Sequence, residues 1–385
     1  MGETGQPSRR GVLTAGAAAA MALAARPAGA AATSLQDLAP AIAELIEAAG
    51  VPSLSLAVLD GGGGVSTIAV GRRALAGEGE VTPKTLYQAA SISKAVAAAA
   101  ALVVAQNGVI DLDADVRGYL RRWQLPPSPF LEDGAAPTFR RLLGMTAGIG
   151  VPGFAGYDPG APLPGLLDIL NGAPPATSPP VAVVAPPGRQ WLYSGGGYEI
   201  VEAALEDATR QSFTTLVTGL VLAPADMGNS MLAQPLPERE TAGAAVGHRA
   251  DGTPLPGGAR VLPELAAAGL WSTPADLARF ARSLSDAYRG RGRVLLDRAR
   301  VRAMLEPVDG FRYGCGGAVA GTGEALCFQK RGQNVGFQAY LVLYPATGQG
   351  AVTMTNGDRG NEVAARLLPL LGVRYAWPEF PGIID

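Results

Sequence analysis

The lysines of this sequence are its first candidates for chemistry. Of the 31 lysines and arginines, only Lys84, Lys94 and Lys330 are lysines. Their scarcity matters because an amine can lose its proton when it is desolvated, whereas a guanidinium effectively cannot. Lys84 lies in a Thr-Pro-Lys-Thr turn and is typical of a surface residue. Lys94 follows Ser91 by three residues, at the start of an Ala/Val-rich stretch.

Ser91 and Lys94 are predicted to begin a buried helix that runs from Ser91 to about Asn107 and ends at Gly108. A separation of three places both side chains on one helix face, while Ser93 points elsewhere. The free N–H groups at a helix N-terminus favour a developing oxyanion. Nearby positive charge and desolvation help an amine to shed its proton, so Lys94 could activate Ser91 as a base. Alone, this spacing is weak evidence, because any serine-capped helix with a surface lysine satisfies it.

Other nucleophilic and metal-dependent schemes lack the residues they need. The chain has one histidine, His248, and two cysteines, which nearly excludes a His/Cys zinc site. A Ser-His-Asp triad would depend on His248, and no G-x-S-x-G sequence occurs. We therefore predict that His248 is a packed structural residue. Asp111, Asp113 and Asp115 resemble the opening of a calcium loop, but its glycine and closing glutamate are missing. No metal or cofactor is predicted.

The two cysteines could form a disulfide. Cys315 and Cys327 flank a Gly-rich turn at residues 321–323, so facing positions on a hairpin could bring their sulfurs together. Such a bridge would add about 3 kcal/mol on the loop-entropy model. Two unpaired buried thiols are the alternative, and the sequence leaves both open.

Strand-like segments lie near both ends of the chain. Residues 53–60 and 65–70 are predicted to form a hairpin around the glycines at 61–64. Further strands are expected at 311–319, 325–329, 336–344 and 350–355, and helices at 198–220, 274–288 and 360–371. This order predicts an α+β fold, with an antiparallel sheet built from both termini and an inserted helical region. The Pro/Gly-rich segment 150–188 is either disordered or a wall around a site.

The composition restricts the class of protein, and the first residues of the chain indicate its cellular location. Hydrophobic residues make up 48% and charged residues 17%, so extended disorder is not expected. A net charge of −2 without a basic run argues against nucleic acid as a partner. Residues 8–13 (SRRGVL), the apolar stretch behind them and Ala28-Gly29-Ala30 are typical of a twin-arginine export signal over residues 1–30.

That signal predicts a single mature domain, residues 31–385, in the periplasm or outside the cell. The alternative for the first residues is an N-terminal membrane anchor, although the apolar stretch is short for one. No stable membrane insertion is expected after the signal is removed. The oligomeric state is not predicted.

Four motifs follow the Ser91–Lys94 pair along the chain and can be compared, together with it, with known families. They are PGRQWLYSGGGY (residues 187–198), AAGLWSTPADL (267–277), KRGQNVGF (330–337) and MTNG (354–357). In this order and spacing the set resembles the class C β-lactamase and D-alanyl-D-alanine carboxypeptidase family, with its esterase and D-aminopeptidase relatives. The likeness covers residues 36–378. It implies a β-lactamase/transpeptidase-like fold, with an α/β part at about 36–85 and 300–378 and a mainly helical part at about 86–299.

The resemblance implies a role for each matching residue. Ser91 would be the acylated nucleophile, Lys94 its base, and Tyr193 a partner in the proton relay. Lys330 would add positive charge beside Tyr193 and bind the polar end of a substrate. The backbone N–H groups of Ser91 and Gln333 would form the oxyanion hole. A tyrosine with a pKa of about 10 becomes a useful proton carrier only if such cations lower that value.

Three positions depart from the family pattern. The family's Tyr-x-Asn is here Tyr193-Ser194-Gly195, which lacks the amide that grips an acylamino group. Arg331, before Gly332, replaces a small residue of the strand motif, and Met145 stands where relatives often have histidine. Gly195, Arg331 and Gly332 are the expected substrate contacts. The first two departures count against efficient β-lactam hydrolysis and suit esters or small amides.

We therefore expect a serine acyl-transfer hydrolase that forms an acyl-enzyme on Ser91 and acts on a small-molecule ester or a D-configured peptide or amide. Three alternatives stay open at this point. One is a transacylase that transfers the acyl group to an alcohol or amine, and another is a true β-lactamase. The third is a penicillin-binding sensor that is acylated without turnover.

Overall fold

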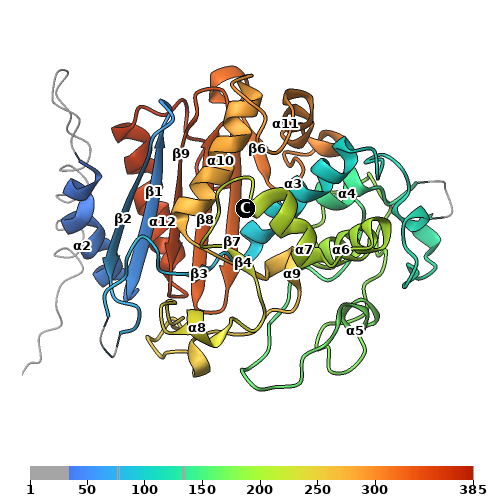
Figure 1. The fold of residues 1–385 in the computed structure, drawn as a ribbon, viewed down its shortest axis with the longest axis horizontal. Helices are drawn as coiled ribbons and strands as arrows, with labels where there is room; N and C mark the ends of the chain where they lie inside the picture. The colour runs from blue at the N-terminus through green and yellow to red at the C-terminus, as the bar shows by residue number, and fades with distance from the viewer. Residues whose placement is uncertain (1–33, 76, 78, 132–134, 385) are drawn as a thin grey trace, which may run out of the picture.

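The computed structural model describes residues 34–75, 77, 79–131 and 135–384. The predicted export signal lies outside these residues. Six antiparallel strands form the main sheet in the order β2-β1-β9-β8-β7-β6 (Figure 1). Their bounds are β1 Ser53–Asp60, β2 Val65–Gly71, β6 Ala318–Ala320, β7 Cys327–Asn334, β8 Phe337–Tyr344 and β9 Gln349–Thr355. The sheet thus joins strands from both ends of the chain, which confirms the predicted fold class.

Both faces of this sheet are covered. Helices α2 (Ala39–Ala49) and α12 (Gly360–Arg374) pack on one face, and α10 (Pro274–Tyr288) packs on the other. The strand side chains alternate accordingly: in β1, Leu54 and Leu56 belong to the core under α2 and α12, whereas Ala57 and Leu59 belong to the core on the α10 side. Because both faces of the sheet are covered, seven of the eight residues of β1 are buried, its two serines among them.

The inserted helical region lies beside the sheet, and its central helix is α3 (Ser93–Gln106). Thirteen of the fourteen residues of α3 are buried, and most are alanine or valine, so neighbouring helices can approach closely. The surrounding helices are α4 Phe139–Leu143, α5 Leu166–Asn171, α6 Gly196–Thr209, α7 Phe213–Val217, α8 Glu238–Thr241, α9 Leu265–Ala268 and α11 Arg298–Met304. A second small sheet consists of β3 Tyr87–Gln88, β5 Leu270–Ser272 and β4 Met231–Leu232.

Single turns of helix connect these elements. They are η1 Leu35–Leu38, η2 Ala90–Ile92, η3 Val116–Gly118, η4 Pro129–Leu131, η5 Thr218–Leu222, η6 Pro256–Gly258, η7 Val308–Gly310 and η8 Gly323–Ala325. Of these, η2 is the important one for function, because it runs directly into α3 and carries Ser91.

Three predicted elements are wrong in extent. The predicted strand 325–329 starts at Cys327 and continues as β7 to Asn334. The predicted helix 198–220 ends at Thr209, where Arg210 adopts a left-handed conformation (φ 58°), and α7 starts afresh behind the capping hydroxyl of Ser212. The predicted strand 311–319 is reduced to β6, because the glycines before it form a tight turn in which the Gly314 N–H donates to the Gly317 carbonyl.

The two cysteines are free and buried, so of the two alternatives the structure shows the unpaired thiols. Cys327 faces Ala320 across the β6–β7 pair, rather than Cys315. The reason is that Cys315 belongs to the core on the α3 side of the sheet, whereas Cys327 belongs to the core under α12. Burial raises the pKa of Cys315 to about 12 and that of Cys327 to about 11, which makes both thiols unreactive.

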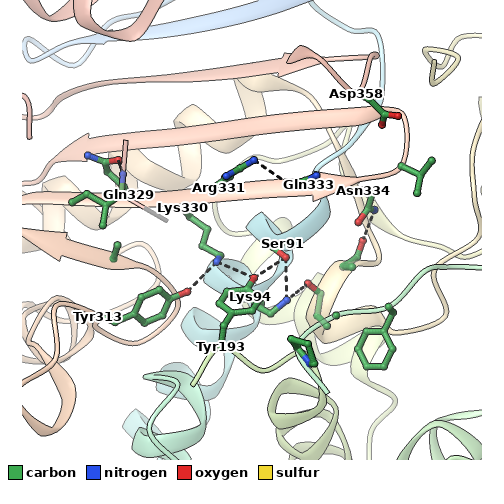
Figure 2. Close-up of a pocket in the computed structure, with 18 of the residues that line it drawn as sticks. Ser91, Lys94, Tyr193, Tyr313, Gln329, Lys330, Arg331, Gln333, Asn334 and Asp358 are labelled. Atoms are coloured by element: carbon green, nitrogen blue, oxygen red, sulfur yellow. Dashed lines mark hydrogen bonds between the residues drawn. The ribbon is translucent and has the colours of Figure 1, made fainter. Parts of the chain in front are cut away.

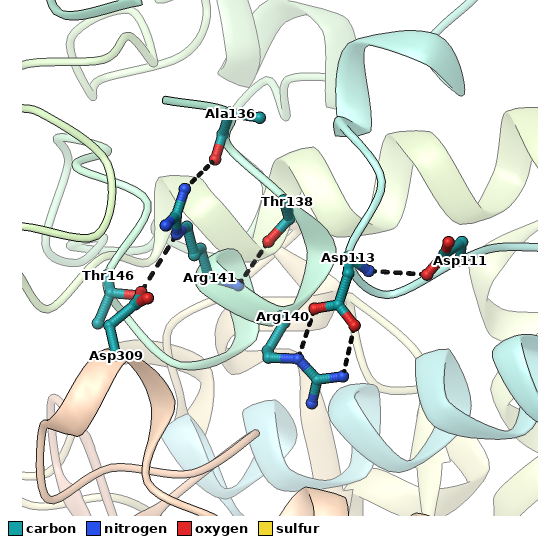
Figure 3. Close-up of polar contacts among 8 residues, drawn as sticks. All are labelled: Asp111, Asp113, Ala136, Thr138, Arg140, Arg141, Thr146 and Asp309. Atoms are coloured by element: carbon teal, nitrogen blue, oxygen red, sulfur yellow. Dashed lines mark hydrogen bonds and ion pairs between the residues drawn. The ribbon is translucent and has the colours of Figure 1, made fainter. Parts of the chain in front are cut away.

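The aspartates that resemble a calcium loop bind protein groups instead (Figure 3). Asp113 forms a two-pronged ion pair with Arg140, with N–O distances of 2.6 and 2.8 Å, and the Asp111 carboxylate accepts the Asp113 N–H. Within the described ranges, no cluster of three or more His, Cys, Asp or Glu residues could hold a metal ion. Likewise, none of the helices in those ranges combines the length and apolarity needed to cross a membrane.

Candidate active site

The turn η2 presents Ser91 at the point where a strand edge and a buried helix meet. Ala90, just before Ser91, has a positive φ of 50°, a conformation that a non-glycine residue adopts only when its surroundings impose it. Strand β7 supplies that constraint. A Cβ on Gly332 would lie 2.2 Å from the Ala89 carbonyl oxygen and 3.2 Å from the Ser91 nitrogen. Glycine at position 332 therefore allows β7 to lie directly against the nucleophile turn.

Lys94 lies in the first turn of α3, on the same side as Ser91, as the spacing predicts. Its Nζ donates to Ser91 Oγ at 3.1 Å and to the Ala267 carbonyl at 2.8 Å. The side chain is only 2% exposed, so the amine is held between two fixed oxygens. Ser93 points elsewhere: its hydroxyl donates to the Ala90 carbonyl and accepts the Leu270 N–H.

Tyr193 completes the environment of the Ser91 hydroxyl (Figure 2). Its phenolic oxygen lies 2.9 Å from Ser91 Oγ and accepts a hydrogen bond from Lys330 Nζ at 3.2 Å. Burial by itself raises the pKa of this phenol, but the charges of Lys330 and Lys94 outweigh burial and lower it to about 7. Tyr193 can therefore take up and release a proton near neutral pH.

Lys330 has a second phenol partner that the sequence did not suggest. Its Nζ donates to the hydroxyl of Tyr313 at 2.9 Å, and burial keeps the pKa of Tyr313 well above the ordinary value. Tyr313 therefore stays neutral while Tyr193 titrates. Nothing in the sequence identifies Tyr313, because it stands alone in an irregular segment and reaches Lys330 only through the fold.

Met145 positions Tyr193 from both sides. Its carbonyl accepts the Leu192 N–H at 2.8 Å, and its Sδ accepts the Ser194 N–H at 3.2 Å. Met145 follows α4 and has a positive φ of 63°. The methionine that stands where relatives often have histidine thus makes the contacts that hold the tyrosine loop.

An ion pair fixes the turn around Met145 (Figure 3). The Asp309 carboxylate accepts hydrogen bonds from Arg141 Nε at 3.2 Å and from the Thr146 hydroxyl at 2.6 Å. Arg141 and Thr146 lie on either side of Met145 in sequence. Asp309 therefore ties both ends of this turn to a distant loop.

Helix α9, whose carbonyl binds Lys94, is supported by buried carboxyl groups of α6. Glu199 accepts the Ala267 N–H at 3.2 Å, and Glu202 accepts the Ala266 N–H at 2.9 Å. Burial raises the pKa of Glu202 to about 8 and that of Glu199 well above its ordinary value. Both therefore act as neutral hydrogen-bonding groups behind the site. They hold the N–H groups of α9, and the Ala267 carbonyl of the same helix binds Lys94.

The side chains around the Ser91 hydroxyl line a cavity of about 810 Å³. Ser91, Lys94, Tyr193 and Lys330 all open into it, as do the predicted residues Arg331 and Gln333. The guanidinium of Arg331 donates to Gln333 Oε1 at 3.0 Å and lies over the ring of Tyr340. The remaining walls are formed by Pro152, Gly153, Phe154, Trp191, Arg249, Ala267, Ala268, Tyr313, Ala318, Gln329, Asn334, Val335, Asp358 and Ile384. Of the two alternatives for segment 150–188, the structure shows a wall, to which residues 152–154 contribute.

Gln333 lies on the part of β7 that runs beside the nucleophile turn η2. Among the described residues, β6 pairs with β7 only at 327–329, so the edge of β7 beyond Gln329 lies against η2 instead of another strand. Gln333 is on this stretch and lines the cavity with Ser91. The hole formed by the N–H groups of Ser91 and Gln333 stays a prediction that this placement favours.

Gly195 and Gly332, predicted as substrate contacts, are not among the residues that line the cavity. Gly332 lies beneath η2, as described above. At Gly195, a Cβ would lie 2.8 Å from Cε2 of Phe154, so the ring of Phe154 occupies the space that the family's asparagine needs. His248 is fully buried, with Nε2 accepting the Leu75 N–H and Nδ1 beside the Asn356 carbonyl. This confirms that it is a structural residue.

The fold and this site together define a serine hydrolase of the β-lactamase type, and comparison with known proteins agrees. The family model described as Beta-lactamase matches residues 38–374. The chain therefore belongs to the Beta-lactamase family and is a serine hydrolase. Among curated proteins it is similar to Esterase EstB of Burkholderia gladioli, with 31% identity over 165 residues. That alignment spans 40% of this chain and 40% of the esterase.

Solved structures share the fold at low sequence identity. The structure of SurE with D-Leu has a TM-score of 0.69 and 23% identity, and the match covers 91% of this chain and 78% of SurE. The D-amino acid amidase from Ochrobactrum anthropi SV3, complexed with L-phenylalanine, has a TM-score of 0.70 and 21% identity, with 88% and 99% covered. These likenesses establish the β-lactamase/transpeptidase-like architecture.

Proposed function

We propose that the chain hydrolyses small esters or D-configured amides through an acyl-enzyme on Ser91. The observation that carries this proposal is the placement of Ser91 Oγ, 3.1 Å from an amine and 2.9 Å from a phenol that titrates near neutral pH. A hydroxyl is a weak nucleophile unless an adjacent base removes its proton. The Tyr193 phenolate, which the charges of Lys94 and Lys330 stabilise, is such a base.

In the proposed reaction, Ser91 Oγ attacks the carbonyl carbon while its proton passes to the Tyr193–Lys94 pair. The carbonyl oxygen becomes an oxyanion that the N–H groups of Ser91 and Gln333 stabilise. The bond to the leaving atom then breaks, and that atom takes the proton from Tyr193. Water repeats these steps in reverse order, releasing the acid and restoring Ser91.

The substrate class rests on the cavity and on the relatives. Phe154 and Trp191 give the cavity aromatic walls, which suit an apolar acyl group. The similar proteins include an esterase and a D-amino acid amidase, and these names support the same two classes of substrate here. With Phe154 in the place of an amide grip, we expect β-lactams to acylate Ser91 slowly.

The test is a burst experiment on the mature chain with p-nitrophenyl acetate. We expect either a burst of p-nitrophenol equal in amount to the enzyme or steady turnover too fast to show a burst. Mass spectrometry of quenched samples should show an acetyl group on Ser91. Ser91→Ala should lose both, whereas Ser66→Ala, at an exposed position of strand β2, should change neither. Turnover by Ser91→Ala at the wild-type rate would refute the proposal. A parallel panel of D- and L-phenylalanine amide, D-alanyl peptides and penicillin then ranks the acyl donors.

We also propose that the protein works outside the cytoplasm, from the twin-arginine sequence at residues 8–13. In a bacterial host that has this export route, the wild-type chain should appear in the periplasm or medium, shortened to begin near residue 31. The variant Arg9→Lys/Arg10→Lys should stay inside at full length. Equal export of both forms would contradict this assignment.

A further inference from the structure

Residues 382–384 reach the active-site cavity and are bound there by a buried side chain. Gln329, on β7 and 3% exposed, donates from Nε2 to the Gly382 carbonyl at 2.8 Å. Its Oε1 accepts the Ile384 N–H at 3.1 Å. One amide side chain thus satisfies a donor and an acceptor of the same short segment, as a neighbouring strand would. The segment has a fixed place next to Lys330, the following residue of β7.

The two isoleucines of this segment have different surroundings. Ile383 packs against the core under α2 and α12, on the far side of the sheet from the site. Ile384 packs against the core that contains α3, and its side chain lines the cavity. Only Ile384 is therefore a wall of the active site, and the side chain of Ile383 contacts the opposite side of the sheet.

Ile384 stands at the end of the cavity where a leaving group has to depart. Figure 2 shows Gln329 and Tyr313 at one end of the site, Asn334 and Asp358 at the other, and Ser91 between them. The substrate's carbonyl oxygen must face Gln333, toward the second end. The leaving atom takes its proton from Tyr193, whose hydroxyl contacts Lys330. It therefore leaves toward Lys330, Tyr313 and the residues beyond them.

We propose that Ile384, bound through Gln329, limits the size of the leaving alcohol or amine and of any acceptor that takes its place. This inference rests on the proposed function. In acylation the bond from the acyl carbon to the leaving oxygen or nitrogen breaks, and Tyr193 supplies the proton. In deacylation the acceptor enters the same space and returns a proton to Tyr193. The acyl chain itself lies outside this space.

Two series of esters separate leaving-group size from acyl size. The first keeps the acetyl group and enlarges the leaving group from phenyl to 2-naphthyl. The second keeps p-nitrophenol and lengthens the acyl chain from acetyl to octanoyl. Ile384→Ala should raise kcat/KM for 2-naphthyl acetate relative to phenyl acetate by about tenfold. In a hydrophobic pocket, space for one more methylene changes the preference between two substrates by about this factor or more. The acyl series should keep its wild-type order.

Ile383→Ala is the matched control, since it shortens the adjacent identical side chain outside the cavity, and it should change neither series. Ile384→Phe should shift the first ratio in the opposite direction. If the wild-type enzyme hydrolyses both aryl acetates and Ile384→Ala leaves the ratio of their kcat/KM values unchanged, this inference is overturned while the proposed function stands. A change in the acyl series instead would overturn it too. No turnover and no labelling of Ser91 in the wild type would refute the proposed function and this inference together.

Discussion

Replacing Lys330 by methionine should move the pH dependence of acylation upward. Tyr193 accepts the serine proton only as phenolate, and its pKa is lowered to about 7. The phenolate therefore forms as the pH rises through this value, so the wild-type acylation rate should rise across the same range. Methionine keeps the length and burial of Lys330 but removes its charge and its hydrogen bond to Tyr193.

The size of the shift follows from the contacts of Tyr193. Its pKa lies about three units below the ordinary value, which corresponds to about 4 kcal/mol in favour of the phenolate. Lys330 and Lys94 supply this stabilisation against the opposing effect of burial. Losing one of two cations should raise the pKa by about one to two units. At neutral pH the phenolate fraction, and with it kcat/KM, should fall about five- to fiftyfold and recover as the pH is raised.

The assay is the burst rate with p-nitrophenyl acetate from slightly acidic to alkaline pH, which isolates acylation from deacylation. Lys330→Arg is the charge control and should keep a pH midpoint near that of the wild type. Tyr313→Phe removes the other partner of Lys330 without removing a cation, and should leave the midpoint nearly unchanged. The reasoning fails if Lys330→Met keeps the wild-type midpoint and only lowers the plateau.

Three further substitutions test other parts of the site. Lys94→Arg should abolish the burst although it keeps the charge, because the buried space between Ser91 Oγ and the Ala267 carbonyl fits a compact amine and not a guanidinium; normal acylation would disprove the role of Lys94. Gly332→Ala should slow acylation about a hundredfold with an unchanged circular dichroism spectrum, since its Cβ pushes β7 away from the nucleophile turn. Gly195→Asn alone should not raise affinity for penicillin in a competition assay, whereas Gly195→Asn with Phe154→Ala should, if the ring of Phe154 is what blocks the amide.

The sequence predicts those parts of the site that depend on short spacing or on a motif. Ser91 and Lys94 lie one helical turn apart, so their contact is local and follows from the spacing alone. Tyr193 and Lys330 are far apart in sequence, and only the family resemblance placed them beside Ser91. Strand-like segments near both ends of the chain were enough to predict the sheet, because alternation at 53–60, the glycine turn behind it and the apolar runs near the C-terminus are local signals.

The missed residues are those whose role depends on long-range packing. Tyr313 reaches Lys330 from an irregular segment, and the Ala267 carbonyl binds Lys94 from a helix of one turn. Ile384 enters the cavity on a segment whose backbone is bound by Gln329, far away in sequence. No local pattern marks any of them. The helix predicted through Arg210 failed for a related reason, since hydrophobic periodicity continues across a residue whose backbone is left-handed.

Phe154 changes the kind of selectivity that this site can have. A pocket that binds a substrate amide by hydrogen bonds rejects analogues without it by large factors, because its own polar groups are left unpaired. An aromatic wall discriminates only by size and shape, about ten- to two-hundredfold for each methylene. In this chain the space next to Gly195 holds an aromatic ring instead of an amide. Acyl donors should therefore differ in rate by their bulk and stereochemistry, while the loss of an acylamino group from a donor should cost little.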